Sequence, residues 1–107
     1  TTGVSTMKYP VRITYLNNNR VDFKMLTLEE ANQKFVIAEG NLLEQEVKVL
    51  HHDTAVRMLK YSKQTVEECL EDITYCTGDV LERVKTRLKE ATADIEILKE
   101  VLEFYSK

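Results

Sequence analysis

The stretch that decides the fold lies near the C-terminus, where residues 81–105 read LERVKTRLKEATADIEILKEVLEFY. Apolar or aromatic residues recur in it at alternating spacings of three and four, and no glycine or proline interrupts them. Such spacings place side chains on one side of an α-helix. The repeating positions are Leu81, Val84, Leu88, Ala91, Ile95, Leu98, Leu102 and Tyr105. The pattern predicts a single unbroken helix with an apolar seam.

This helix is long for a chain of 107 residues. At the helical rise, about 28 residues span roughly 42 Å, whereas a compact domain of this size measures roughly 26–30 Å across. We therefore expect other long helices, or a second copy of the chain, to cover the seam. The residues predicted to form this helix seam and oligomer interface are Leu81, Val84, Leu88, Ile95, Leu98 and Leu102.

A second stretch with helical spacing comes before the first one. Its seven repeating positions are Leu59, Ser62, Val66, Cys69, Ile73, Cys76 and Val80, six of them apolar. The two cysteines would lie about 10 Å apart along a helix, which is too far for a disulfide bond. We expect both to be small buried residues. Unpaired thiols fit a reducing compartment, so a cytoplasmic location is predicted.

The N-terminal part predicts a β-hairpin. Residues 11–16 and 20–25 alternate between apolar and polar side chains, and three asparagines separate them. Asparagine tolerates the left-handed conformation of tight turns. One face is expected to carry Val11, Ile13, Tyr15, Val21, Phe23 and Met25, and to lie on the helices. The other face would then be basic, with Arg12, Arg20 and Lys24 as candidate contacts for a partner or a nucleic acid.

Residues 27–50 allow two interpretations. Thr27 and Glu30 form a capping box, and apolar residues at three- and four-residue spacings follow it, which favours a helix bent at Gly40. The alternative is a short helix over 27–34, followed by strands near 35–38 and 46–50, because residues 46–49 alternate. The helix is the favoured prediction.

Together these patterns predict an α+β fold that is mainly α. An N-terminal β-hairpin over residues 7–26 is followed by two or three long amphipathic helices over residues 27–107, in an elongated bundle or coiled coil. We expect residues 7–107 to form a single domain. Residues 1–6 precede Met7, which we interpret as the natural initiator, and are predicted to be a vector-derived remnant or a disordered tail.

Composition and motifs exclude several function classes. The net charge is −3, which disfavours non-specific binding to phosphate backbones. No apolar segment approaches the roughly 20 residues of a membrane span. The sequence has no glycine-rich phosphate loop, no HExxH and no CxxC. Adjacent histidines in His51-His52-Asp53 cannot converge on one metal from a helix, so we expect a solvated inter-helix junction there.

We therefore predict no catalytic residues, no cofactor and no metal. The favoured hypothesis is a non-enzymatic protein–protein interaction module, such as a regulator, inhibitor, adaptor or assembly chaperone, built on an oligomerising helical bundle. Its expected partners are another protein and further copies of itself, with no membrane. The alternative hypothesis is a small nucleic-acid-binding regulator that uses the basic face of the hairpin.

Overall fold

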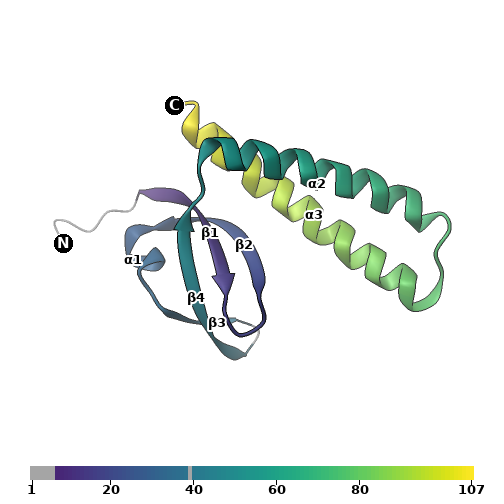
Figure 1. Ribbon diagram of the computed structural model, residues 1–107, viewed down its shortest axis with the longest axis horizontal. Coiled ribbons are helices and arrows are strands. Elements are labelled where there is room, and N and C mark those ends of the chain that lie inside the picture. Colours follow the sequence, from purple (N-terminus) through teal and green to yellow (C-terminus); the bar gives the residue numbers. More distant parts are fainter. Residues whose placement is uncertain (1–6, 39) are drawn as a thin grey trace. The chain divides into compact units, whose positions relative to one another are not determined.

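The computed structural model describes residues 7–38 and 40–107. The prediction for residues 1–6 lies outside these described residues. The chain divides into two compact units, one ending at His51 and one beginning at His52. The first is a sheet unit and the second a helical unit (Figure 1). The predicted α+β class is confirmed, with the sheet first and the helices after it.

The sheet unit contains four strands and one short helix. In chain order they are β1 (Lys8–Tyr15), β2 (Arg20–Thr27), α1 (Leu28–Ala31), β3 (Phe35–Ala38) and β4 (Asn41–Val49). All neighbouring strands pair antiparallel, in the order β2-β1-β4-β3. Consequently β2 and β3 are the edge strands, and α1 lies beside β1 and β2 (Figure 1).

The hairpin of β1 and β2 forms as predicted, but its register differs. Tyr15 pairs with Arg20 across a loop of four residues, and Ile13 pairs with Asp22. An even loop pairs each odd-numbered residue with an even-numbered one. Paired residues share a face. The predicted grouping of Val11, Ile13 and Tyr15 with Val21, Phe23 and Met25 is therefore wrong, because it needed a loop of three or five residues.

The core of the sheet unit forms within the sheet itself. Val11, Ile13 and Tyr15 form a cluster of buried apolar residues on β1. Half-buried apolar side chains from the other three strands pack against them: Leu26, Val36, Leu43 and Val47. Every one of these residues lies on the same face by register. The prediction that only the helices could cover the hairpin is thus wrong, since β3 and β4 supply the missing apolar surface.

Residues 27–50 adopt the alternative interpretation, and the favoured helix is wrong. The capping box is present: Glu30 N–H donates to the Thr27 hydroxyl at 3.2 Å, and Thr27 N–H donates to the Glu30 carboxylate at 3.0 Å. These contacts, with the backbone bond as the larger cause, lower the pKa of Glu30. The helix nevertheless ends at Ala31. Gly40 has φ +78°, a left-handed conformation that breaks any helix and turns β3 into β4.

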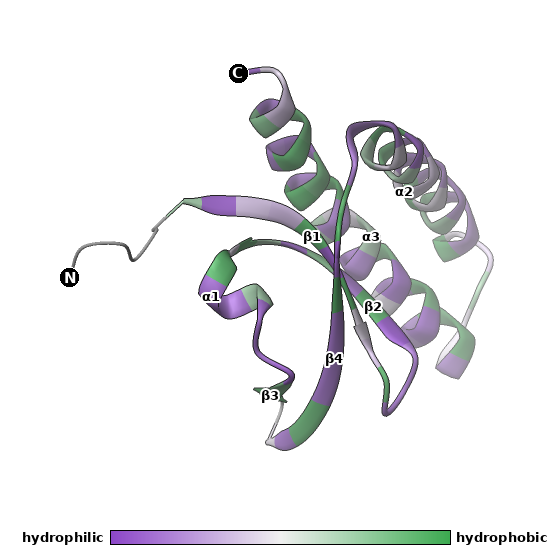
Figure 2. Cartoon of the chain, turned by 60° about the vertical axis from the view of Figure 1, so that its left-hand side comes forward, coloured by the Kyte–Doolittle hydropathy of each residue, from purple (hydrophilic) through white to green (hydrophobic). Residues whose placement is uncertain are grey.

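The helical unit is a pair of long helices joined by a short connection. They are α2 (His52–Ile73) and α3 (Gly78–Tyr105), and they pack against each other as an antiparallel hairpin (Figure 1). The unbroken C-terminal helix is confirmed, and its 28 residues match the expected length. Apolar and polar residues alternate along α3 with helical spacing (Figure 2). Assembly into an elongated bundle or coiled coil stays a prediction, as does a single domain over residues 7–107.

Candidate protein-interaction surface

Three of the large apolar side chains exposed on the sheet unit lie on the hairpin of β3 and β4. Phe35 is 52% exposed, Ile37 79% and Leu42 65%. The register pairs Ile37 with Leu42, and Phe35 lies two residues from Ile37, so all three share one face. The end of β4 next to β3 is coloured as hydrophobic in Figure 2. We call these three residues and the outer side of β3 the apolar edge.

The backbone of β3 presents hydrogen-bonding groups on its outer side. Gln45 N–H donates to the carbonyl oxygen of Lys34 at 2.8 Å, so Lys34 and Gln45 are a hydrogen-bonded pair. Such pairs alternate with non-bonded ones along an antiparallel ladder. Val36 therefore bonds to Leu43, whereas the N–H and C=O of Phe35 and Ile37 point away from β4. No described residue forms a hydrogen bond with these outward groups.

The two sheet edges differ in charge. β2 carries Arg20, Asp22 and Lys24, whereas β3 consists of Phe35, Val36, Ile37 and Ala38. Charged side chains on an edge strand discourage pairing with another chain, and uncharged apolar edges permit it. The edge formed by β3 is therefore suited to accept an additional strand.

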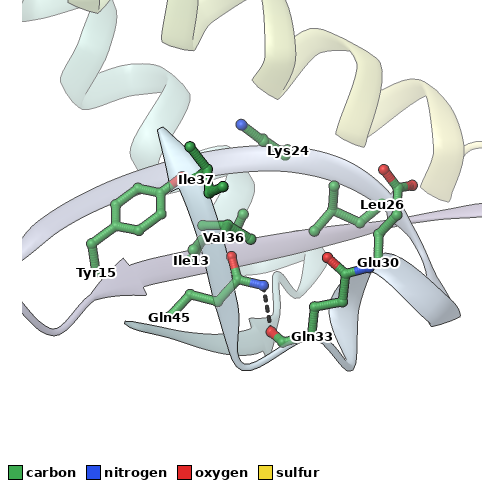
Figure 3. Close-up of a pocket in the computed structure, with 9 residues that line it drawn as sticks. All are labelled: Ile13, Tyr15, Lys24, Leu26, Glu30, Gln33, Val36, Ile37 and Gln45. Carbon is green, nitrogen blue, oxygen red and sulfur yellow. Dashed lines mark hydrogen bonds between the residues drawn. The ribbon is translucent and has the colours of Figure 1, made fainter. Parts of the chain in front are cut away.

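A cavity lies over the core-lining face of the sheet. Its volume is about 250 Å³, and its apolar lining consists of Ile13, Leu26, Val36 and also Ile37 of the apolar edge (Figure 3). The Gln45 side-chain amide donates to the carbonyl oxygen of Gln33 at 2.6 Å across its wall. Small-molecule sites usually measure roughly 300–1,000 Å³. The cavity is smaller than these, and we assign no ligand to it.

Tyr15 lines this cavity and also interacts with the charged side chains of Arg20 and Asp22 on β2. The pKa of its phenol lies above the ordinary 10.0, first because of burial, then because of the negative charge of Asp22 and the hydrogen bond to Asp22. The positive charge of Arg20 opposes these effects. Arg20 also forms an ion pair with Asp22, with a nitrogen–oxygen distance of 3.9 Å.

Alkaline pH is expected to destabilise the sheet unit through Tyr15. The unfolded chain loses the phenolic proton near pH 10, whereas the folded protein keeps it to higher pH. Stability is therefore complete below pH 10 and falls as pH rises through the folded-state pKa. Tyrosinate absorbance measures this, because the difference between wild type and Tyr15→Phe isolates the Tyr15 titration. It should appear above pH 10.0, the ordinary value of a tyrosine phenol. A Tyr15 titration at or below pH 10.0 would contradict this prediction.

The three candidate basic contacts do not share a face. Arg12 pairs with Phe23 and Lys48, while Arg20 and Lys24 pair with Tyr15 and Val11 on the other side of the sheet. The predicted basic face is therefore wrong, for the same reason of loop length as the apolar grouping. Nucleic-acid binding stays a prediction without the shared basic surface on which it depended.

The predicted seam of α3 is covered within the helical unit. Leu98 is completely buried, and the other five seam residues are half-buried: Leu81, Val84, Leu88, Ile95 and Leu102. The buried residues of α2 are small: Ala55, Ser62, Thr65 and Cys69. Small side chains let two helices approach closely. The seam thus packs against α2, and its role as an oligomer interface stays a prediction.

The cysteines and histidines, all within the described part of the chain, belong to no metal-binding cluster there. Cys69 is buried, Cys76 is half-buried, and both are free thiols as expected. The cytoplasmic location stays a prediction. His51 and His52 lie where β4 leads into α2, so the predicted inter-helix junction is wrong. The His52 ring meets Tyr105 edge-on, with centroids 5.8 Å apart.

Residues 7–38 and 40–107 contain neither a cluster of metal ligands nor a helix long and apolar enough to cross a membrane. No group of three or more His, Cys, Asp or Glu side chains there is placed to hold a metal ion. Neither long helix in that part of the chain has an apolar segment of the length that a bilayer crossing requires. Comparison with known proteins finds no matching family, no matching curated protein and no matching solved structure.

The apolar edge was absent from the predicted site residues. Residues 35–38 are the longest uninterrupted apolar run in the chain, and this run was the available signal. Its role depends on β3 being an edge strand, which is set by the pairing of β4 with β1. That pairing joins residues far apart in the sequence, and no local pattern predicts it.

Proposed function

We propose that the chain is a non-enzymatic protein–protein interaction module of the regulator, inhibitor, adaptor or assembly-chaperone type, which binds protein through its apolar edge. The single observation that carries this proposal is that β3 has outward backbone groups that no described residue pairs with, together with the exposed side chains of Phe35, Ile37 and Leu42. Partner strands bind such edges by adding to the sheet, and side-chain contacts then supply specificity.

The energetics of exposure support the same proposal. Phe35, Ile37 and Leu42 stay in contact with water until a partner covers them. Full burial of each side chain would contribute roughly 1.5–3 kcal/mol of favourable free energy to binding. The seam of α3 is already packed against α2 in the same chain. The apolar edge is therefore the more available of the two apolar surfaces, and we assign partner binding to it.

Site-specific photo-crosslinking tests this function. A photoreactive amino acid replaces Ile37 in one variant and Gln64 in another, and each full-length chain is irradiated in its source cell. Gln64 is an exposed polar residue on α2 and serves as the matched control. We expect a discrete protein adduct from position 37 and none from position 64. Adducts with a second copy of the chain count, because they too are protein–protein contacts.

Two results would contradict the proposal. Irradiation at position 37 could give no adduct beyond that of position 64, or it could give equal adducts at both. In the first case the edge meets no protein, and in the second the contact is not specific to the edge. Circular dichroism of both purified variants verifies that the replaced residues leave the fold intact.

A further inference from the structure

We propose that the partner segment that adds to β3 also inserts one large apolar side chain, of leucine, methionine or phenylalanine size, into the cavity lined by Ile37. The inference rests on the proposed function, because it specifies how a partner protein is recognised at the same apolar edge. Three observations carry it: the place where the cavity opens, the chemistry of its lining, and the register that β3 imposes on an added strand.

The cavity opens at the apolar edge. Ile37 lines the cavity and is nevertheless 79% exposed, so its side chain lies at the mouth. The innermost lining residues come from β1, where Ile13 and Tyr15 are buried. Figure 3 shows the lining side chains arranged around one space, with Ile37 among them. One residue thus belongs both to the edge that can accept a strand and to the entrance of the cavity.

The sheet curls around this cavity. β2 and β3 stand at opposite ends of the strand order, yet Leu26 of β2 and Val36 of β3 line the same space. Figure 2 shows the curvature of β4, which lies between β1 and β3 in the sheet. The two edge strands therefore face each other across the cavity, and no pairing joins them in the described part of the chain. A segment that extends the sheet beyond β3 consequently approaches the cavity mouth.

The lining selects an apolar occupant, because its polar side chains already interact within the protein. The Gln45 amide donates to the carbonyl oxygen of Gln33, and the Glu30 carboxylate accepts from Thr27. The Thr27 hydrogen bonds are the main cause of the lowered pKa of Glu30, and the positive charge of Lys24 adds to it. Among the described residues, no buried side-chain nitrogen or oxygen lacks a hydrogen-bond partner. A polar group entering the cavity would therefore find no buried group that needs it.

The volume fits a single side chain. A cavity of roughly 150 Å³ lined by apolar residues is large enough to bind benzene, and this one measures about 250 Å³. Protein interfaces gain much of their affinity from a few anchor side chains that fill such pockets, with polar residues around them. The exposed residues Lys24, Glu30 and Gln33 supply a polar rim here.

The register of strand addition directs the anchor toward the cavity. The outward backbone groups of β3 belong to Phe35 and Ile37, so the bonded residues of an antiparallel partner stand opposite these two. The partner residue between them stands opposite Val36, and opposite residues share a face. Because Val36 lines the cavity, this middle side chain is the one that enters. Its two neighbours lie beside the exposed side chains of Phe35 and Ile37.

Methyl NMR of the purified full chain tests whether the cavity accepts an apolar side chain. Toluene, the side-chain analogue of phenylalanine, is titrated into protein labelled at its isoleucine, leucine and valine methyl groups. Acetamide, the analogue of asparagine, is the control probe. We expect toluene to shift the signals of Ile13, Leu26 and Val36 saturably, and acetamide to leave them unchanged. Leu16 and Val21 are exposed and lie outside the lining, so their signals report non-specific contact.

A matched pair of variants ties the toluene signal to the cavity. Leu26→Phe fills part of the cavity and should weaken toluene binding at least about 10-fold, whereas Leu16→Phe adds the same ring at an exposed site and should leave it unchanged. The proposal is overturned if toluene gives no saturable shift, if Leu16 and Val21 shift as much as the lining residues, or if Leu26→Phe binds toluene normally. If Leu26→Phe does not fold, Val36→Leu replaces it.

Photo-crosslinking from inside the cavity tests the partner. A diazirine analogue of leucine replaces Leu26 in one full-length chain and Leu16 in another, and each is irradiated in the source cell. Leu26 is half-buried and Leu16 is 47% exposed, so random contact would favour position 16. We expect position 26 to give an adduct with the same protein as position 37, attached at an apolar residue of that protein, and position 16 to give none. Mass spectrometry identifies the attached residue, and attachment at a polar residue would overturn the insertion.

Failure of this inference is distinguishable from failure of the proposed function. An adduct at position 37 without one at position 26 would overturn the insertion and leave the interaction module standing. The absence of adducts at both positions would overturn both, even if toluene enters the cavity. Adducts with one protein at both positions, together with saturable toluene binding, support both.

Discussion

Replacement of Leu98 by alanine is expected to lower the free energy of unfolding of the helical unit by about 2–5 kcal/mol. Leu98 is 0% exposed and lies in the C-terminal half of α3, on the buried side that also carries Ala91 and Val101. The substitution removes buried apolar atoms and leaves a cavity, because neighbouring helices relax only partly. Urea unfolding monitored by the helical circular-dichroism signal measures the loss.

The matched control for Leu98 is Leu70, an exposed leucine on α2. Leu70→Ala removes the same atoms from a site that water already reaches, so the expected change is within about 0.5 kcal/mol. Leu88→Ala should fall between the two, because Leu88 is half-buried. Equal losses for Leu98→Ala and Leu70→Ala would show that the seam of α3 is not packed as described.

The sheet unit has an equivalent central residue in Ile13. We expect Ile13→Ala to cost about 2–5 kcal/mol of stability. Its side chain is 2% exposed and lies on the middle of β1, which pairs with β2 on one side and β4 on the other. Native-state amide hydrogen exchange in β1 and β4 reports the free energy of opening of this unit directly.

Ile37→Ala provides the comparison for Ile13→Ala within the same sheet. Ile37 is 79% exposed, so its truncation should change hydrogen exchange in β1 by less than about 0.5 kcal/mol. Its expected effect is instead to weaken the proposed binding of a protein partner by the apolar edge. Truncation of Ile13 is thus expected to affect stability, whereas truncation of Ile37 is expected to affect binding. A large loss of exchange protection in Ile37→Ala would contradict the description of Ile37 as a surface residue.

The helical unit could be predicted from the sequence because its signal is local and uninterrupted. Leu81 through Leu102 repeat with one period, and no glycine or proline competes with the helix. α3 packs against α2, which directly precedes it in the chain. Local propensity, apolar spacing and tertiary contacts all agree there, and such agreement makes prediction from one sequence reliable.

The sheet unit could be predicted only in part, since its decisive contacts are non-local. Residues 35–49 fit both a helical spacing and a strand alternation. Residues 41–49 form a strand because they pair with β1, with Val49 opposite Val11 and Gln45 opposite Tyr15. The faces of the first hairpin depended on whether its loop had an even or odd length, which three consecutive asparagines do not specify. The candidate site could not be predicted for the same reason, because an edge is defined by strand order.

The confinement of all strand pairs to residues 8–49 has a consequence for biosynthesis. Proteins emerge from the ribosome N-terminus first, and compact parts fold in that order. Every strand of this sheet has been made before the first residue of α2 is added to the nascent chain. The whole sheet unit is therefore complete in sequence, and can begin to fold, while the helices are still being translated.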